Sequence, residues 1–170
     1  MNGLYGISLA DNAINTQESL SKIILFLKYY TSDEYRLVKL KDEFAMIGLF
    51  GEVMAAGTGN SYNITANIRD DESSNLYIPS KSLLLLALDM LVFQNVTAET
   101  KGNMIIDAHS EERSFFISFT GSYFSDTGKI RKRADSIEKA FESAYGPGIK
   151  VELSSSEMDF LEIGVTLHLG

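Results

Sequence analysis

Apolar residues recur at helical intervals in a first segment, at about residues 12–30. Five of them fall on one helical face: Leu20, Ile23, Ile24, Leu27 and Tyr30. Leu25 and Phe26 lie off this stripe, so the pattern predicts a second buried face, with another subunit as one candidate partner. Packing within the chain's own core competes with this interpretation on about equal terms, because aromatic side chains usually pack inside.

A second helix is predicted over about residues 40–56. Its inner face is formed by Leu40, Phe44, Ile47, Gly51 and Met54. Asp42 and Glu43 fall in its first turn, where the helix macrodipole favours acidic side chains, and Gly57 and Gly59 end it. The two segments together predict an N-terminal helical hairpin over residues 1–59.

After residue 60 the apolar pattern changes to alternation with a period of two, which is typical of strands. Loops are expected at residues 69–75 and 121–133, where polar residues dominate. The remaining elements are predicted as strands at 62–68, 103–108, 114–120, 149–153 and 161–169, a short extended piece at 76–79, and helices at 80–94 and 134–145. Short connections between the strands favour hairpins, and the predicted fold is an α+β two-layer sandwich. Its mixed, mostly antiparallel sheet carries helices on one face, within a domain spanning residues 60–170.

Composition narrows the classes of function. No apolar run approaches the roughly 18 residues that a membrane span needs, no secretory leader is visible, and the chain has no cysteine for disulfides or thiolate metal sites. The net charge of −8 makes nucleic acid a poor partner, since phosphate backbones repel acidic proteins. A short basic cluster at residues 129–133 is assigned to a solvated loop. A cytoplasmic location is the simplest expectation.

Four stretches, in order and spacing, resemble the transmitter region of LytS-like sensor histidine kinases, which is built on the GHKL (Bergerat) ATPase fold. They are LFLKYY at 25–30, VKLKDE at 38–43, LYIPSKSLLLLALDML at 76–91 and AFESAYGPGIKVEL at 140–153. The resemblance covers roughly residues 20–170. It implies a nucleotide site beside the helix at 80–94, with Mg²⁺ and ATP as ligands, and a phosphorylated histidine on the helical hairpin.

The residues at the family's nucleotide-binding positions depart from its pattern. The helix at 80–94 corresponds to the family's N box, whose Glu and Asn positions are Leu88 and Asp89 here. At the end of the next strand, Thr120 stands at or near the adenine-binding Asp, and Gly121 is the one glycine kept. Tyr123 and Phe124 add bulk where glycines are expected. Asp89, Thr120 and Gly121 are therefore interpreted as vestigial nucleotide-site positions.

Two further departures concern the phosphate loop and the phosphorylated histidine. Residues 122–133 hold one glycine, Gly128, and no Gly-x-Gly that would cradle phosphates. The family's Gly-Thr before the last strand is also missing, since EIGVTLHL at 162–169 offers only Gly164. The two histidines, His109 and His168, lie outside the predicted helical hairpin. His109 is expected at the end of a strand, beside a hairpin, as a loop histidine, and His168 is expected in the last strand. Neither residue matches the family's phospho-acceptor.

Asp89 has two interpretations. It could be a relict Mg²⁺ ligand, or a structural residue near the solvent edge, and the second is favoured because acids are rarely fully buried. An unpaired buried carboxylate would be costly, so edge exposure or a hydrogen-bonded partner is expected.

The leading hypothesis is a degenerate, histidine-kinase-like signalling protein that neither phosphorylates itself nor hydrolyses ATP. It would act through protein contacts, as a homodimer through the helical hairpin or with a response regulator or an active kinase. The alternative is a diverged kinase or phosphotransfer module that still binds ATP, with Asp89 holding Mg²⁺ and Thr120 near adenine. A third hypothesis has the old cleft filled by Tyr123 and Phe124, or holding another small ligand.

Overall fold

The computed structural model describes residues 14–32, 36–58, 62–94, 101–122, 124, 126–155 and 160–168. Its helices are α2 (Ile14–Tyr30), α3 (Leu40–Thr58), α4 (Asp71–Asn75), α5 (Ser82–Val92) and α6 (Thr127–Tyr145). Its strands are β1 (Leu37–Lys39), β2 (Tyr62–Ile68), β3 (Tyr77–Pro79), β4 (Gly102–Glu111), β5 (Ser114–Ser122), β6 (Ile149–Ser155) and β7 (Phe160–His168).

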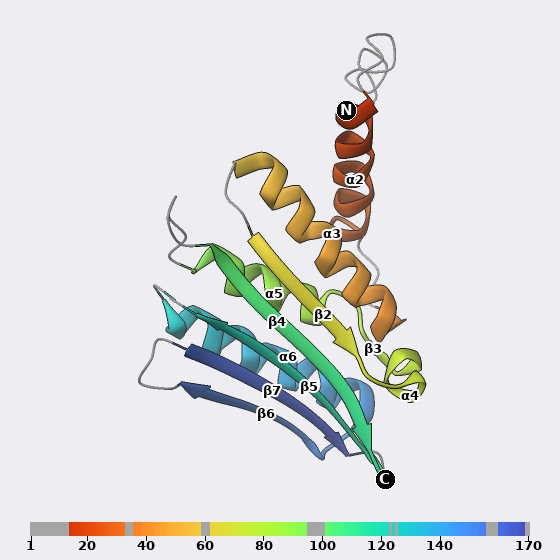
Figure 1. Cartoon of the computed structure of the whole chain (residues 1–170). Coiled ribbons are helices and arrows are strands. Elements are labelled where there is room, and N and C mark those ends of the chain that lie inside the picture. The colour runs from red at the N-terminus through yellow and green to blue at the C-terminus, as the bar shows by residue number, and fades with distance from the viewer. Residues whose placement is uncertain are drawn as a thin grey trace.

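A five-stranded mixed sheet forms one layer, in the order β2-β4-β5-β7-β6. Strands β2 and β4 are parallel, and every other neighbouring pair is antiparallel. Figure 1 shows α5 and α6 behind this sheet, with α3 beside β2 and the first turns of α2 projecting away from the rest. The predicted α+β architecture, with a mostly antiparallel sheet and helices on one face, is confirmed.

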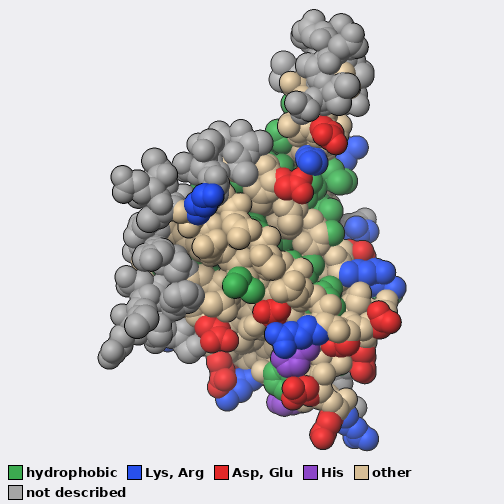
Figure 2. Space-filling model, viewed as in Figure 1, with side chains coloured by type: hydrophobic (Ala, Val, Ile, Leu, Met, Phe, Trp, Pro, Cys, Tyr) green, Lys and Arg blue, Asp and Glu red, His purple; other side chains and the backbone are tan. Residues whose placement is uncertain are grey.

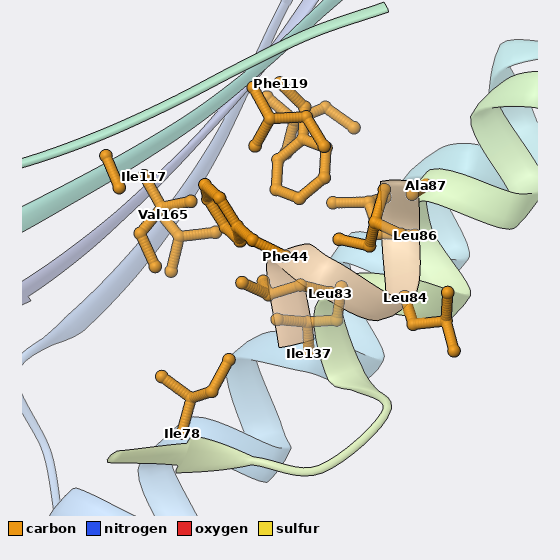
Figure 3. Close-up of a cluster of buried hydrophobic side chains, with 14 of the residues drawn as sticks. Phe44, Ile78, Leu83, Leu84, Leu86, Ala87, Ile117, Phe119, Ile137 and Val165 are labelled. Carbon is orange, nitrogen blue, oxygen red and sulfur yellow. The ribbon is translucent and has the colours of Figure 1, made fainter. Parts of the chain in front are cut away.

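The core lies between the sheet and its helices. Alternate residues of β5 point toward α5, because side chains of a strand alternate between its two faces. Figure 3 shows Ile117 and Phe119 of β5 facing Leu86 and Ala87 of α5, with Phe44 of α3 between them. All five side chains are buried, and they belong to one continuous apolar cluster.

The two N-terminal helices contact each other, and α3 also belongs to the main core. Phe26 of α2 stacks on Phe50 of α3 with ring centroids 5.3 Å apart. Leu40 and Ile47 of α3 are buried in the same cluster as the sheet residues, and β1 pairs with β3 in a small second sheet. The predicted division of the chain at residue 59 therefore runs through a shared core in the described residues.

A buried carboxylate from α3 holds the start of α5. Glu43 has no solvent-exposed surface, and its two oxygens accept hydrogen bonds from Lys81 N (3.1 Å) and Leu84 N (2.9 Å). The phenol of Tyr29, on α2, donates a third hydrogen bond to it. The first amides of a helix have no partner within the helix, so this carboxylate replaces the missing side-chain cap of α5. Glu43 thus joins α2, α3 and α5.

Two segments predicted as loops contain helices. The chain at 69–75 includes α4, capped by Asp70, whose carboxylate also accepts from Ser110 N of β4. Burial raises the pKa of Asp70, but hydrogen bonds from Ser73 and Ser110 outweigh it and lower the pKa to about 2. The expected loop at 121–133 is wrong as well, because α6 begins at Thr127.

The basic residues 129–133 consequently lie on a helix and not on a solvated loop. Asp126 caps this helix by accepting from Gly128 N (3.1 Å) and Lys129 N (3.2 Å). Among the helices that the structure describes, none is both long enough and apolar enough to cross a membrane.

Candidate functional site

Asp89, the acid in the middle of α5, faces the neighbouring helix α6. Its Oδ2 atom accepts a hydrogen bond from Arg133 Nε at 2.7 Å, in an ion pair whose side chains are 18% and 33% exposed. Of the two expectations for Asp89, edge exposure or a hydrogen-bonded partner, the structure shows the partner. The carboxylate that could have held a metal ion is bound instead by a fixed cation.

A cavity of about 340 Å³ lies beside this ion pair. Its lining residues are Asp89, Phe93, Lys129, Lys132, Arg133 and Ser136. Lys129 Nζ lies 4.8 Å from the centroid of the Phe93 ring, a cation–π contact that joins α5 and α6 a second time. The groove along the second half of α5 is thus bridged at two points by side chains of α6.

The end of the sheet next to α5 is tightly packed. Gln94 is buried, and its Nε2 atom donates to Asn103 O at 2.6 Å. A Cβ atom added to Gly121 would lie 2.8 Å from Phe124 Cζ and 2.9 Å from Gln94 Nε2, closer than such atoms approach in proteins. Phe124, which is half-buried against the core, therefore occupies space beside Gly121. Tyr123 lies outside the described residues.

The structure does not bring Asp89, Thr120 and Gly121 together on one surface. Phe119 and Gly121 are buried on the face of β5 that α5 covers, so Thr120 between them points to the opposite face. Thr120 pairs there with Ile105, which is among the exposed apolar residues. Asp89 lies on the helical side, where the sheet separates it from the Thr120 side chain.

The connection between β5 and α6 is short, and the start of α6 is already capped. Four residues separate Ser122 from Thr127. Gly128 lies in the first turn of α6, and its amide donates to Asp126. A phosphate at a helix start needs such amides free. A capping carboxylate both occupies them and repels an anion, so these residues do not fit the phosphate loop of a nucleotide site.

Both histidines lie on strands, on the face of the sheet away from the helices. His109 belongs to β4, not to a loop as predicted, and stacks on Phe116 of β5 with centroids 5.1 Å apart. His168 Nδ1 lies 2.8 Å from Ser114 Oγ. Figure 2 shows the histidine side chains at the lower end of this face, among charged groups. Within the described residues no three acidic or histidine side chains converge as a metal site.

Comparison with known proteins identifies the fold. No protein-family model matches the sequence. No curated protein matches it either. The structure is similar to the nucleotide-free catalytic domain of the histidine kinase ThkA, with a TM-score of 0.54 and 10% identity, over 79% of this chain and 95% of that chain.

Two further solved structures agree with this assignment. The histidine kinase AdeS of Acinetobacter baumannii gives a TM-score of 0.52 at 10% identity, covering 96% of this chain and 82% of that chain. ThkA in complex with the response regulator TrrA gives a TM-score of 0.53 at 11% identity, covering 96% of this chain and 50% of that chain. The chain therefore has the fold of histidine kinase catalytic domains.

Three residues important to this region escaped the sequence interpretation. Arg133 is 44 positions from Asp89, and the sequence predicts a loop where its helix begins. The sequence pattern predicts Gln94 only as the end of a helix, and Glu43 only as an acid that favours the start of one. The patterns along the chain indicate which face of an element is apolar, but they do not indicate which distant polar groups meet.

Proposed function

We propose that this protein is a degenerate, LytS-like histidine kinase homologue that signals through protein contacts, without binding Mg²⁺-ATP or phosphorylating itself. The observation that carries the proposal is the ion pair between Asp89 and Arg133. Asp89 stands at the Mg²⁺-binding position of the family, and its charge is neutralised by a cation of the same chain. Leu88, at the position of the family's catalytic Glu, packs against the core.

Two further observations support the loss of nucleotide binding. Phe124 and Gln94 fill the space beside Gly121, and Asp126 caps the amides at the start of α6. A nucleotide would have to displace an aromatic ring and two carboxylate contacts. The cost of leaving these groups unpaired works against binding even if the overall fold is kept.

Calorimetric titration of the protein with ATP and with ADP, each with Mg²⁺, is expected to show no binding in the micromolar range. Labelled ATP is likewise expected to leave no phosphate on the protein. An active histidine kinase catalytic domain measured in parallel serves as the positive control. Micromolar, Mg²⁺-dependent binding that Asp89→Asn weakens would establish the alternative, a working nucleotide site with Asp89 as metal ligand.

A protein that does not phosphorylate itself can signal by binding other proteins. We propose α2 as the surface through which it forms a homodimer. Leu25 of α2 is 52% exposed, and Tyr30, at the end of the same helix, is 41% exposed. The helix begins away from the sheet, so a second copy could pair with it (Figure 1). The ThkA–TrrA complex shows that a protein of this fold binds a response regulator, which we propose as a further partner class. We place this activity in the cytoplasm of a bacterial cell.

Leu25→Glu is expected to convert a dimer into a monomer in sedimentation velocity experiments, because it puts a charge into an apolar interface. Val92→Glu is the matched control, since Val92 is also 52% exposed but lies on α5. The control should remain dimeric. A wild-type protein that is monomeric at all concentrations would contradict the proposed α2 interface.

A further inference from the structure

A second cavity, of about 430 Å³, lies at the other end of the groove between α5 and α6. It is bounded by the last residues of α2, the turn between β3 and α5, the first half of α5, and the middle of α6. It shares Arg133 and Ser136 with the smaller cavity beside Asp89. Its volume is in the range of small-molecule sites in proteins.

The charge of this cavity is opposite to that of the chain. Lys81 and Arg133 are among the lining residues, and no Asp or Glu is. The whole chain carries a net charge of −8. Asp89 pairs with Arg133 from outside this lining, so the net positive charge of the cavity comes from Lys81, and it favours an anionic ligand in so acidic a protein.

The lining also offers an apolar surface. Pro79 and Leu85 contribute from one side, and Ile137 and Ala140 from α6. An inorganic ion would leave this surface in contact with water. A ligand that joins an anionic group to an apolar body would use both halves of the cavity.

The polar groups of the cavity have bonding capacity left. Lys81 Nζ donates one hydrogen bond, to Ser32 O, and an ammonium group has three protons. Arg133 uses Nε for Asp89, and the described residues provide no acceptor for its terminal amino groups. Ser82 Oγ donates to Pro79 O at 2.6 Å and Ser136 Oγ to Lys132 O at 2.9 Å, so both hydroxyls offer free lone pairs.

The position of Lys81 is fixed by its surroundings. Its backbone is left-handed, with φ of 66°, a conformation that non-glycine residues rarely adopt. The buried Glu43 carboxylate accepts from its amide at 3.1 Å. These contacts fix the backbone of Lys81, and the hydrogen bond from its Nζ atom to Ser32 O directs the side chain toward the end of α2.

We propose that this cavity binds a small organic anion, a carboxylate or phosphate monoester on an apolar body, with its charge between Lys81 and Arg133. Such a ligand would touch α2, α5 and α6 together, and so would stabilise the docking of α2 on the rest of the chain. Asp89 does not line this cavity, but it holds Arg133 in the ion pair, so the inference rests on the proposed function to the extent that this ion pair is intact.

The test is a titration of the protein, monitored by two-dimensional NMR, with phenyl phosphate, inorganic phosphate and phenol as probes in the absence of Mg²⁺. Phenyl phosphate binding is expected to be saturable and to shift the amide signals of Leu85, Ile137 and Ala140. The apolar surface should make it bind more tightly than inorganic phosphate, and the cations should make it bind more tightly than phenol. Equal affinity for phenol, or shifts confined to other regions, would overturn the proposal.

Lys81→Gly separates binding from folding, because glycine adopts the left-handed backbone without strain. It is expected to weaken phenyl phosphate binding about tenfold, as loss of a charge-assisted hydrogen bond does. Lys132→Gln is the matched control, since Lys132 lines only the neighbouring cavity of the two. Unchanged affinity in Lys81→Gly, or an equal loss in Lys132→Gln, would refute the assignment.

Discussion

Glu43→Ala is expected to lower the free energy of unfolding by about 3 kcal/mol or more, since each unsatisfied buried donor costs about 1–3 kcal/mol. The substitution leaves three donors without their acceptor: Lys81 N, Leu84 N and the Tyr29 hydroxyl. The carboxylate of Glu43 and the amide of Leu84 are fully buried, while Tyr29 and Lys81 are partly buried, so the cost is greatest at Leu84. Urea denaturation followed by circular dichroism measures the loss.

Two controls separate the cap from other effects of the substitution. Asp42→Ala removes the neighbouring acid of the same helical turn, which is exposed and makes only a macrodipole contribution, so its effect should stay near or below about 1 kcal/mol. Tyr29→Phe removes one of the three donors and should fall between the two. If Glu43→Ala is no more destabilising than Asp42→Ala, the buried cap does not hold α5.

The same carboxyl gives the stability a recognisable dependence on pH. Burial raises the pKa of Glu43 above its ordinary value, and the hydrogen bonds from Tyr29 and the α5 amides oppose this only in part. The folded state therefore binds this proton more tightly than the unfolded chain. The contribution of Glu43 is greatest at low pH and declines as the pH rises through the raised pKa. Glu43→Gln should remove that decline.

Asp70 has the opposite effect. Its pKa is lowered to about 2 in the fold, so its contribution is complete above its ordinary pKa and is lost as the pH falls toward 2. Acid unfolding of the wild type should therefore be concentrated below the ordinary carboxyl range. Asp70 is the same in both proteins, so the difference in the pH dependence of unfolding free energy between Glu43→Gln and the wild type reports Glu43 alone.

Periodicity predicted the layers of this fold because it depends on which face of each element is buried. The alternation at 62–68 and the helical spacing at 40–56 fall on β2 and α3. The sequence pattern does not predict the start of α6 because Ile130 is the one large apolar residue of its first turns, which are otherwise polar and hold Gly128, although Ile130 extends the buried stripe of Ala134, Ile137 and Phe141. The Asp126 cap was the available signal.

The packing around α5 could be predicted only in part. The missing glycines and the bulk of Phe124 led the sequence to predict a disabled site, and that remains a prediction. The ion pair of Asp89 with Arg133 could not be predicted, because it depends on how α6 lies against α5. The faces of β5 also required the structure: a shift of one residue moves a side chain to the other side of a sheet, and Thr120 is on the side without helices.

Gly121→Val is expected to destabilise the protein by about 2–3 kcal/mol, the cost of overpacking a filled interior. The new side chain would meet Phe124 Cζ, Gln94 Nε2 and, at 3.3 Å from Cβ, the backbone oxygen of Asn103. Gln94 cannot swing away cheaply, because its Nε2 atom is hydrogen-bonded to that same oxygen. Thermal or urea unfolding gives the value.

Gly164→Val is the matched control for this substitution. Gly164 lies on β7 in the same sheet, and a Cβ atom added there meets nothing within 4 Å. A β-branched residue suits a strand, so Gly164→Val should be neutral or slightly stabilising. If Gly121→Val is tolerated equally well, the end of the sheet has room that the packing of Phe124 does not fill. A ligand could then enter there, and the proposal of a closed nucleotide cleft would fail on the same measurement.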